Sequence, residues 1–227
     1  MLPGVLAYKT LLEENSMNFT HTEPKDIETT SFKIIEEELE NRKISLNETY
    51  ASIIKRVIHT TADFDYASTM TFSENALENY KKAISEGAMI VTDTNMALAG
   101  INKKAIKKLK VDAVCYMADE EVVEEAKKEG VTRASLSMRK AAKLNRPVIY
   151  VIGNAPTALI ELKNHIDKGY KPAFVIAVPV GFVNVVEAKE LIMQSEVPYI
   201  VNKGRKGGSN VAAAVVNALS YKLALDT

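Results

Sequence analysis

The chain has 227 residues, of which 47% are hydrophobic, so it is long enough to bury the core of one large or two small globular domains. Its 29 basic and 29 acidic residues give a formal net charge of zero, so composition favours neither nucleic acid nor an anionic membrane as a partner. The single cysteine, Cys115, excludes a disulfide within the chain and a cysteine-based metal site, and its place in an apolar run indicates a core residue.

Residues 1–25 show no sustained hydrophobic period, and they mix proline, glycine and asparagine. We therefore expect a loosely ordered extension, followed by a single domain at residues 26–227. The first apolar run is too short and too broken for a signal peptide, and no apolar segment reaches the length of a membrane span. These features predict a cytoplasmic protein.

The next part of the chain has a helical pattern. From Asp26, apolar residues recur at helical spacing as far as Leu39, with acidic residues on the other face, which predicts an amphipathic helix. A second helix is predicted to be capped by Asn47 and to end near His59.

A polar loop is predicted from Thr60 to Thr71. Ser73 is a good N-cap for a third helix at residues 74–86, and Gly87 is the expected C-terminal stop.

From Ala88 onward, apolar runs of strand length alternate with helical stretches. The predicted strands are Ala88 to Val91, Val111 to Cys115, Pro147 to Ile152, Ala173 to Val178 and Tyr199 to Val201. Continuous apolar strands are buried on both faces, and their alternation with helices indicates parallel pairing through right-handed crossovers. The expected fold class is α/β: a three-layer, doubly wound, Rossmann-like domain with a mainly parallel sheet of about five strands, preceded by helices.

In such folds, ligands bind beyond the carboxyl ends of the strands. The predicted loops at those ends are polar or contain glycine; they include Gly153 to Thr157, Pro179 to Asn184 and Asn202 to Asn210. We therefore expect a site made of loops.

His59 is the first candidate for proton chemistry, because it lies where a predicted helix runs into a polar loop. Arg56, three residues earlier, shares its helical face. The plainer interpretation is a partly buried histidine with satisfied hydrogen bonds. A metal site formed by His59, Asp63 and Asp65 is a weaker alternative, since these residues match no metal-binding motif.

The segment Gly204-Arg205-Lys206-Gly207-Gly208-Ser209 precedes a helix rich in alanine and valine. Its backbone N–H groups, the helix dipole and two cations could together bind an anion, although it is neither a P-loop nor a Gly-x-Gly-x-x-Gly motif. The alternative is a turn that needs glycine only for its backbone geometry.

Two further helix starts carry candidate residues. Asn154 is the expected N-cap of a helix with Pro156 in its first turn, which explains both residues without a ligand, whereas Thr157 could face one. Thr132 is the expected cap of another helix, where Arg133 is either a solvated side chain or a fork for a carboxylate.

Several motifs together resemble the precorrin-8X methylmutase family, also called cobalt-precorrin-8 methylmutase. They run from Ser31 to Leu219 and include Ser31-Phe32-x-Ile34-Ile35, Arg56-Val57-Ile58-His59, Gly153-Asn154-Ala155-Pro156-Thr157-Ala158-Leu159, Pro179-Val180-Gly181-Phe182-Val183 and Gly204-Arg205-Lys206-Gly207-Gly208-Ser209. Ala188 stands where serine is usual in the family, and Glu28 stands where some relatives have an aromatic residue; these departures blur pocket details.

The resemblance implies an isomerase of cobalamin (vitamin B12) biosynthesis. It would move a methyl group at ring C of precorrin-8X or cobalt-precorrin-8 to give hydrogenobyrinate or cobyrinate, without cofactor or bound metal. It also implies a homodimer and a corrinoid tetrapyrrole substrate, with neither nucleic acid nor membrane as a partner. His59 would be the proton donor or acceptor. The implied substrate contacts are Ser31, Arg56 and Arg133, with Asn154, Thr157, Arg205, Gly207, Gly208 and Ser209 as weaker candidates.

Two other functions stay open. A non-catalytic corrinoid- or anion-binding protein would keep the same loops without turnover. A nucleotide-using α/β enzyme is disfavoured, because the phosphate-binding motifs are missing.

Overall fold

The computed structural model describes residue 23 and residues 26–225. The chain divides into two compact units, residues 1–43 and 44–227. In the first unit, helix α2 (Ile27–Asn41) confirms the predicted amphipathic helix. Apart from Glu23, the predicted extension at residues 1–25 lies outside the described residues, and the single domain at 26–227 stays a prediction.

The second unit contains a six-stranded sheet with strand order β1-β6-β5-β4-β2-β3. Its strands are β1 (Met70–Phe72), β2 (Met89–Thr92), β3 (Asp112–Cys115), β4 (Val148–Ile152), β5 (Phe174–Ala177) and β6 (Tyr199–Asn202). Strands β2 to β6 are parallel to one another, whereas β1 pairs with β6 in the antiparallel direction. The predicted α/β fold with a mainly parallel sheet is therefore confirmed.

The helices of this unit follow the predicted alternation from β2 onward. They are α3 (Ala51–Thr61), α4 (Tyr66–Thr69), α5 (Ala76–Ser85), α6 (Asn95–Gly100), α7 (Lys103–Lys108), α8 (Glu120–Glu129), α9 (Arg133–Ala142), α10 (Pro156–Asp167), α11 (Val185–Met193) and α12 (Ser209–Leu225). No helix within the described residues combines the length and the apolar character needed to cross a bilayer.

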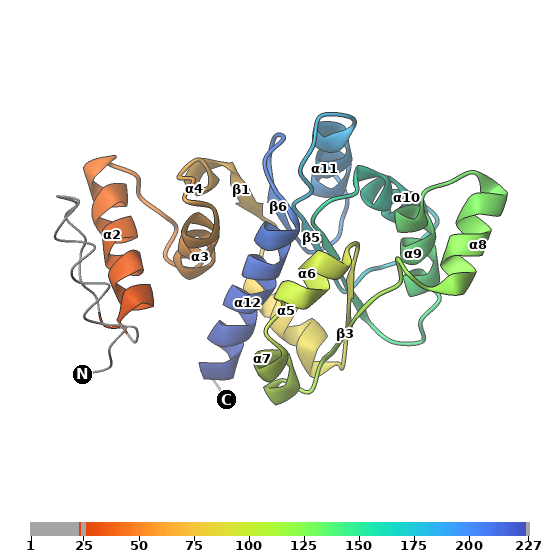
Figure 1. Ribbon diagram of the computed structural model, residues 1–227, viewed down its shortest axis with the longest axis horizontal. Helices are drawn as coiled ribbons and strands as arrows, with labels where there is room; N and C mark the ends of the chain where they lie inside the picture. Colours follow the sequence, from red (N-terminus) through yellow and green to blue (C-terminus); the bar gives the residue numbers. More distant parts are fainter. Residues whose placement is uncertain (1–22, 24–25, 226–227) are drawn as a thin grey trace, which may run out of the picture. The chain divides into compact units, whose positions relative to one another are not determined.

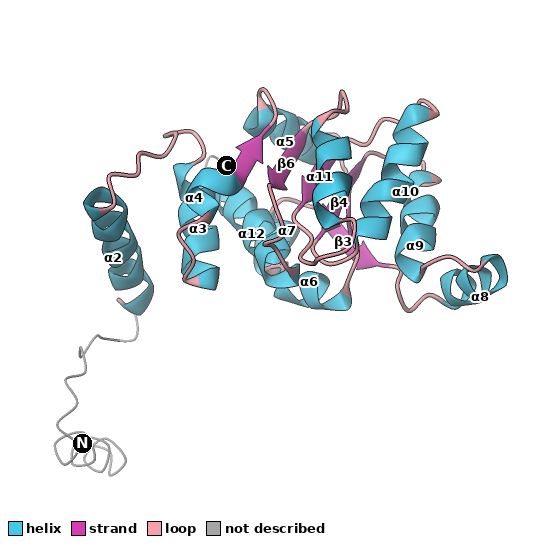
Figure 2. Cartoon of the chain, turned by 90° about the horizontal axis from the view of Figure 1, so that it is seen from above, coloured by secondary structure: helices cyan, strands magenta, loops and turns pink. Residues whose placement is uncertain are grey.

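Helices cover both faces of the sheet. Successive side chains of each strand point to opposite faces, so each face contributes apolar side chains to a core. On one face, Val91, Tyr150 and Val175 pack in one core with side chains of α9, α10 and α11. On the other face, the Phe174 ring meets Tyr80 of α5 edge to face at 5.4 Å, and α3, α6 and α7 pack against α12. Figure 1 shows α9, α10 and α11 on one side of the strands and α5, α6 and α12 on the other, and Figure 2 shows the strands between the helices from above.

The sixth strand, β1, lies partly within the predicted loop from Thr60 to Thr71. This strand has only three residues, too few to show a two-residue alternation, and its pairing with β6 joins segments about 130 residues apart in sequence. The same predicted loop also contains the last two residues of α3 and all of α4. Long-range pairing, rather than a local pattern, determines the structure of this segment.

Two predicted helix caps are wrong. The Asn47 side chain accepts a hydrogen bond from the N–H of Thr49 at 2.9 Å, in a turn that precedes α3. The Ser73 hydroxyl accepts from the N–H of Tyr199 at 2.9 Å and so ties the end of β1 to β6, while α5 begins after Asn75. Both side chains satisfy backbone donors, as capping residues do, but outside a helix.

The carboxyl ends of the five parallel strands lie at one edge of the sheet. Because β1 is antiparallel, the chain enters it at this same edge, coming from α3 and α4. The start of α3 lies near the end of α12, since the Lys222 ammonium donates to the carbonyl of Thr49 at 3.0 Å. The opposite end of α3, with His59, therefore points toward the carboxyl edge.

Candidate functional site

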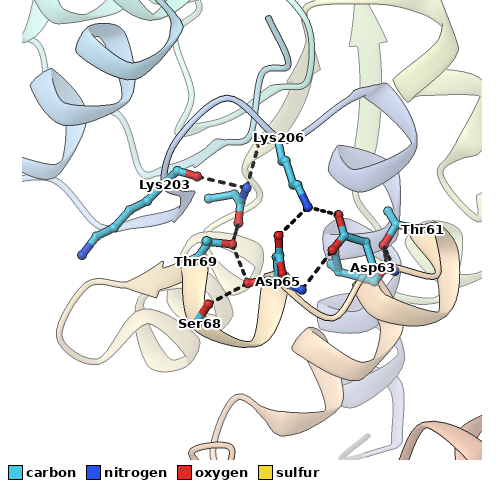
Figure 3. Close-up of polar contacts among 9 residues, drawn as sticks. Thr61, Asp63, Asp65, Ser68, Thr69, Lys203 and Lys206 are labelled. Atoms are coloured by element: carbon cyan, nitrogen blue, oxygen red, sulfur yellow. Dashed lines mark hydrogen bonds and ion pairs between the residues drawn. The ribbon is translucent and has the colours of Figure 1, made fainter. Parts of the chain in front are cut away.

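The end of α3 is joined to the glycine-rich loop after β6 by a cluster of charges. The Lys206 ammonium lies 2.6 Å from a carboxylate oxygen of Asp63 and 2.6 Å from one of Asp65. Figure 3 shows the Lys206 side chain extending between the two acids. Segments more than 140 residues apart in sequence thus form one surface at the carboxyl edge.

This cluster is in place across neutral pH. The hydrogen bond from Lys206 lowers the pKa of Asp63 below its ordinary value of 3.8, and the two acids raise the pKa of Lys206 above its ordinary value of 10.5. The contribution of Asp63 is therefore lost only as the pH falls below about 4, and that of Lys206 only as the pH rises above about 10.5. Lys206, expected to help bind an anion, instead pairs with two carboxylates.

A second tie fixes the same two segments. The Thr69 hydroxyl donates to the side-chain oxygen of Asn202 at 2.6 Å, and the Asn202 amide nitrogen donates to the carbonyl of Lys206 at 2.8 Å. The N–H of Lys203 donates to the carbonyl of Thr69 at 2.9 Å. Asn202 is fully buried, so its hydrogen bonds hold the loop from below.

His59 and Arg56 lie on α3 beside this cluster. The His59 side chain is exposed, one turn before the left-handed residue Ala62 that ends the helix. Arg56 is half-buried, and its guanidinium lies 5.6 Å from the centre of the Tyr221 ring on α12. The His59 imidazole thus lies at the surface of α3, and Arg56 is oriented by a cation–π contact.

Two glycines of the 203–208 loop, Gly207 and Gly208, are required by its backbone geometry. A Cβ on Gly207 would lie 2.1 Å from the carbonyl oxygen of Val178, and Gly208 has φ of +143° while its N–H donates to the same oxygen at 2.9 Å. Ser209 starts α12, and its hydroxyl oxygen lies 2.8 Å from the hydroxyl oxygen of Thr94. Backbone geometry thus accounts for both glycines, and ligand contact by Gly207, Gly208 and Ser209 stays a prediction.

The start of α10 is organised by a buried acid that sequence analysis missed. Asp93, which has no exposed surface, accepts hydrogen bonds from the N–H groups of Gly153, Asn154 and Ala155 at 2.9, 2.8 and 2.7 Å. Burial raises the pKa of Asp93, while the three N–H donors act in the opposite direction. A hydrogen-bond partner 60 residues away in sequence leaves no local signal; the only hint is an acid directly after a buried strand.

The predicted cap at Asn154 is therefore wrong. Helix α10 begins at Pro156 with Ala155 as its N-cap, no side chain caps it there, and the Asn154 side chain is exposed. Asn154 thus stands at the carboxyl edge with its backbone N–H fixed by Asp93 and its side chain exposed.

Arg133 and Thr157 lie together, toward the opposite end of the carboxyl edge. Thr132 caps α9 as predicted, accepting from the N–H of Ser135 at 3.1 Å, and its hydroxyl lies 2.9 Å from that of Thr157. The Arg133 guanidinium donates to the carbonyl of Met117 at 3.3 Å. The Arg133 guanidinium thus lies beside the loop after β3, four strands from β6, whereas Thr157 follows β4, two strands from β6.

Two predicted substrate contacts remain, Ser31 and Arg205. Ser31 lies on α2 in the first unit, where its hydroxyl donates to the carbonyl of Ile27 at 2.9 Å. The Arg205 guanidinium lies 5.5 Å from the centre of the exposed Phe182 ring, in the loop after β5. Among the described residues, no group of three His, Cys, Asp or Glu side chains is arranged to hold a metal ion.

Comparison with known proteins decides the family. A sequence profile for precorrin-8X methylmutase matches residues 26–222. The chain belongs to the precorrin-8X methylmutase family. The resemblance noted in the motifs is thereby confirmed, and with it the expectation of an isomerase of cobalamin biosynthesis.

Individual relatives agree with this membership. The chain is 45% identical over 199 residues to cobalt-precorrin-8 methylmutase of Priestia megaterium, covering 87% of this chain and 88% of that protein. It is 42% identical over 205 residues to the Salmonella typhimurium protein of the same name, covering 88% and 96%. A crystal structure of precorrin-8x methyl mutase from Thermus thermophilus superposes with a TM-score of 0.78 at 37% identity, covering 88% of this chain and 98% of that one.

Proposed function

We propose that this methylmutase rearranges precorrin-8X or its cobalt form, with His59 as the proton donor or acceptor. The observation that carries the proposal is the junction at Lys206. It ties the end of α3, where His59 is exposed, to the glycine-rich loop at the sheet edge where doubly wound folds bind ligands.

The proposed reaction is an isomerisation. One carbon–carbon bond to the migrating methyl group breaks and another forms at a neighbouring ring carbon, so substrate and product have the same composition. A proton delivered to the conjugated macrocycle during migration is returned afterwards. The reaction therefore requires a positioned acid–base group in the protein, and it requires neither an oxidant nor an external methyl donor.

Charge complementarity supports a corrinoid substrate. The acetate and propionate groups of a corrinoid project from several sides of the ring, so their partners need not lie together. Arg205 at one end of the carboxyl edge and Arg133 at the other are both exposed, and guanidinium groups bind carboxylates through paired hydrogen bonds. Asn154 and Thr157 could add neutral contacts near Arg133.

Two finer points belong to the same proposal. The names of the Priestia and Salmonella relatives favour cobalt-precorrin-8 as the substrate. We also propose a homodimer, because Phe182 and Val183 beside Arg205 are 82% and 76% exposed, and a second subunit would bury them. The cytoplasmic location expected from the sequence belongs to the proposal as well.

The test is a comparison of binding and turnover. Purified protein is incubated with each substrate form, and conversion is followed in the visible spectrum, because methyl migration changes the conjugation of the chromophore. We expect His59→Ala to bind substrate with nearly unchanged affinity but to convert it about 10²–10⁴-fold more slowly. His165→Gln, which removes an imidazole from the far end of α10, is the matched control and should retain turnover.

The alternative function predicts a different outcome. A non-catalytic corrinoid-binding protein would bind both forms and convert neither, in the wild type as well as in the variant. Turnover that survives unchanged in His59→Ala would show that another group handles the proton.

A further inference from the structure

Lys189 is a buried cation that the proposed chemistry does not use. It lies on α11 with none of its surface exposed, and its ammonium donates to the carbonyl oxygens of Gly204 at 2.7 Å and Lys206 at 2.9 Å. Within the described residues, no carboxylate forms an ion pair with it. Its bonds hold the backbone of the glycine-rich loop and nothing else.

Burying such a group is unfavourable, so its presence needs a reason. An ammonium removed from water loses its hydration, and burial accordingly lowers the pKa of Lys189 from 10.5 to about 8. A methionine would fill nearly the same volume without this cost. The two hydrogen bonds, rather than packing, are therefore what a lysine contributes at this position.

The two carbonyls that Lys189 binds belong to the neighbours of Arg205. The carbonyl of Arg205 itself accepts a hydrogen bond from the N–H of Gly181 at 3.2 Å, and its guanidinium rests over Phe182. The backbone around Arg205 is thus held at three consecutive carbonyls. Lys189 of α11 binds those of Gly204 and Lys206, and Gly181 in the loop after β5 binds that of Arg205. An exposed arginine on a glycine-rich loop would otherwise sample many positions.

We propose that Lys189 is a positioning residue that acts through Arg205, fixing the loop so that the guanidinium is presented to a carboxylate of the substrate. The proposal rests on the proposed function, because it assumes an anionic substrate at this edge. It assigns Lys189 no contact with substrate. Its effect must therefore vanish when Arg205 is absent.

A double-mutant cycle tests this dependence. Lys189→Met, Arg205→Met and the double variant are compared in steady-state turnover of the corrinoid substrate. Charge-assisted hydrogen bonds correspond to effects of roughly ten- to hundredfold. We expect Lys189→Met to raise KM about tenfold with kcat changed much less, Arg205→Met to do the same, and the double variant to be no worse than Arg205→Met alone. Lys203→Met, which removes an exposed lysine from the same loop, is the control and should match the wild type.

Amide hydrogen exchange provides a second readout that does not depend on the reaction. In Lys189→Met, the amides of Gly181 and Gly208, which donate to the carbonyls of Arg205 and Val178, should exchange faster than in the wild type, and those of the sheet should not. If wild-type protein converts neither substrate, the proposed function fails, and unchanged exchange would then overturn the loop-holding role as well. Should Lys189→Met not fold, Lys189→Gln, which is too short to reach both carbonyls, replaces it in both measurements.

Three results would overturn the proposal. The first is an additive double variant, which would mean that Lys189 acts independently of Arg205. The second is a fall in kcat at constant KM, which indicates loss of folded enzyme rather than a misplaced guanidinium. The third is loop exchange equal to that of the wild type.

Discussion

The glycines of the loop after β6 have two explanations: they let a ligand approach the backbone, or they are needed for the backbone geometry of the loop. Substitution of Gly207 by alanine separates the two. A Cβ at this position would lie 2.1 Å from the carbonyl oxygen of Val178 and 2.7 Å from that of Pro179, whereas ordinary contact begins near 3.4 Å. Both obstacles are backbone atoms, which cannot rotate away as a side chain can. The loop must therefore move by more than about 1 Å away from the end of β5.

The magnitude follows from what this movement breaks. Forcing one extra carbon into a closely packed site costs about 1–3 kcal/mol. The hydrogen bond from the N–H of Gly208 to the carbonyl of Val178 would also be lost, at about 1 kcal/mol. We expect Gly207→Ala to lower the free energy of unfolding by about 2–4 kcal/mol, and to raise KM because Arg205 moves with the loop.

Urea unfolding and steady-state kinetics check both effects, with Gly204→Ala as the control. Gly204 lies in the same loop at φ of +73°, but nothing is within 4 Å of its would-be Cβ. Its substitution should cost only the left-handed backbone penalty, about 1–2 kcal/mol. Equal losses of stability in the two variants would refute the steric argument. A rise in KM without any loss of stability in Gly207→Ala would mean that the glycine serves ligand approach instead.

Two more predictions concern buried ionisable groups. The pKa of Lys189 is lowered from 10.5 in the unfolded chain to about 8 in the folded one. Between these two pH values the unfolded chain binds more protons than the folded one. The free energy of unfolding should therefore rise with pH across this window, by up to about 3 kcal/mol. Urea unfolding of Lys189→Met should lack this rise, and wild-type and variant curves that run parallel would contradict the prediction. Asp93→Asn places an amide nitrogen against backbone donors and should cost about 1–3 kcal/mol, whereas Asp112→Asn, with 73% of its side chain exposed, should cost less than about 1 kcal/mol. Similar midpoints for these two variants would show that the buried carboxylate does not hold the start of α10.

The sequence determined the sheet and its class. The five parallel strands are found where continuous apolar runs predicted them, because a strand covered by helices on both faces must be apolar throughout. The order of these runs with helices between them required parallel pairing, and so the sequence also indicated which loops share the carboxyl edge. A helix cap whose partner is close in sequence was also predictable. Thr132 before α9 is an example, because the N–H that it binds is three residues away.

Only the tertiary structure decided how the site is held together. Asp93 holds the segment before α10, 60 residues further along the chain, and Lys206 joins a loop to the end of α3 across about 140 residues. The buried Lys189 looks in sequence like any exposed helical lysine. Asn47, Ser73 and Asn154 were wrongly predicted to cap helices. A side-chain oxygen binds whichever backbone donor the fold brings near, inside a helix or outside it. Apolar periodicity is a local property of the chain, whereas a hydrogen-bond partner is chosen by proximity in space, and proximity exists only after the sheet has formed.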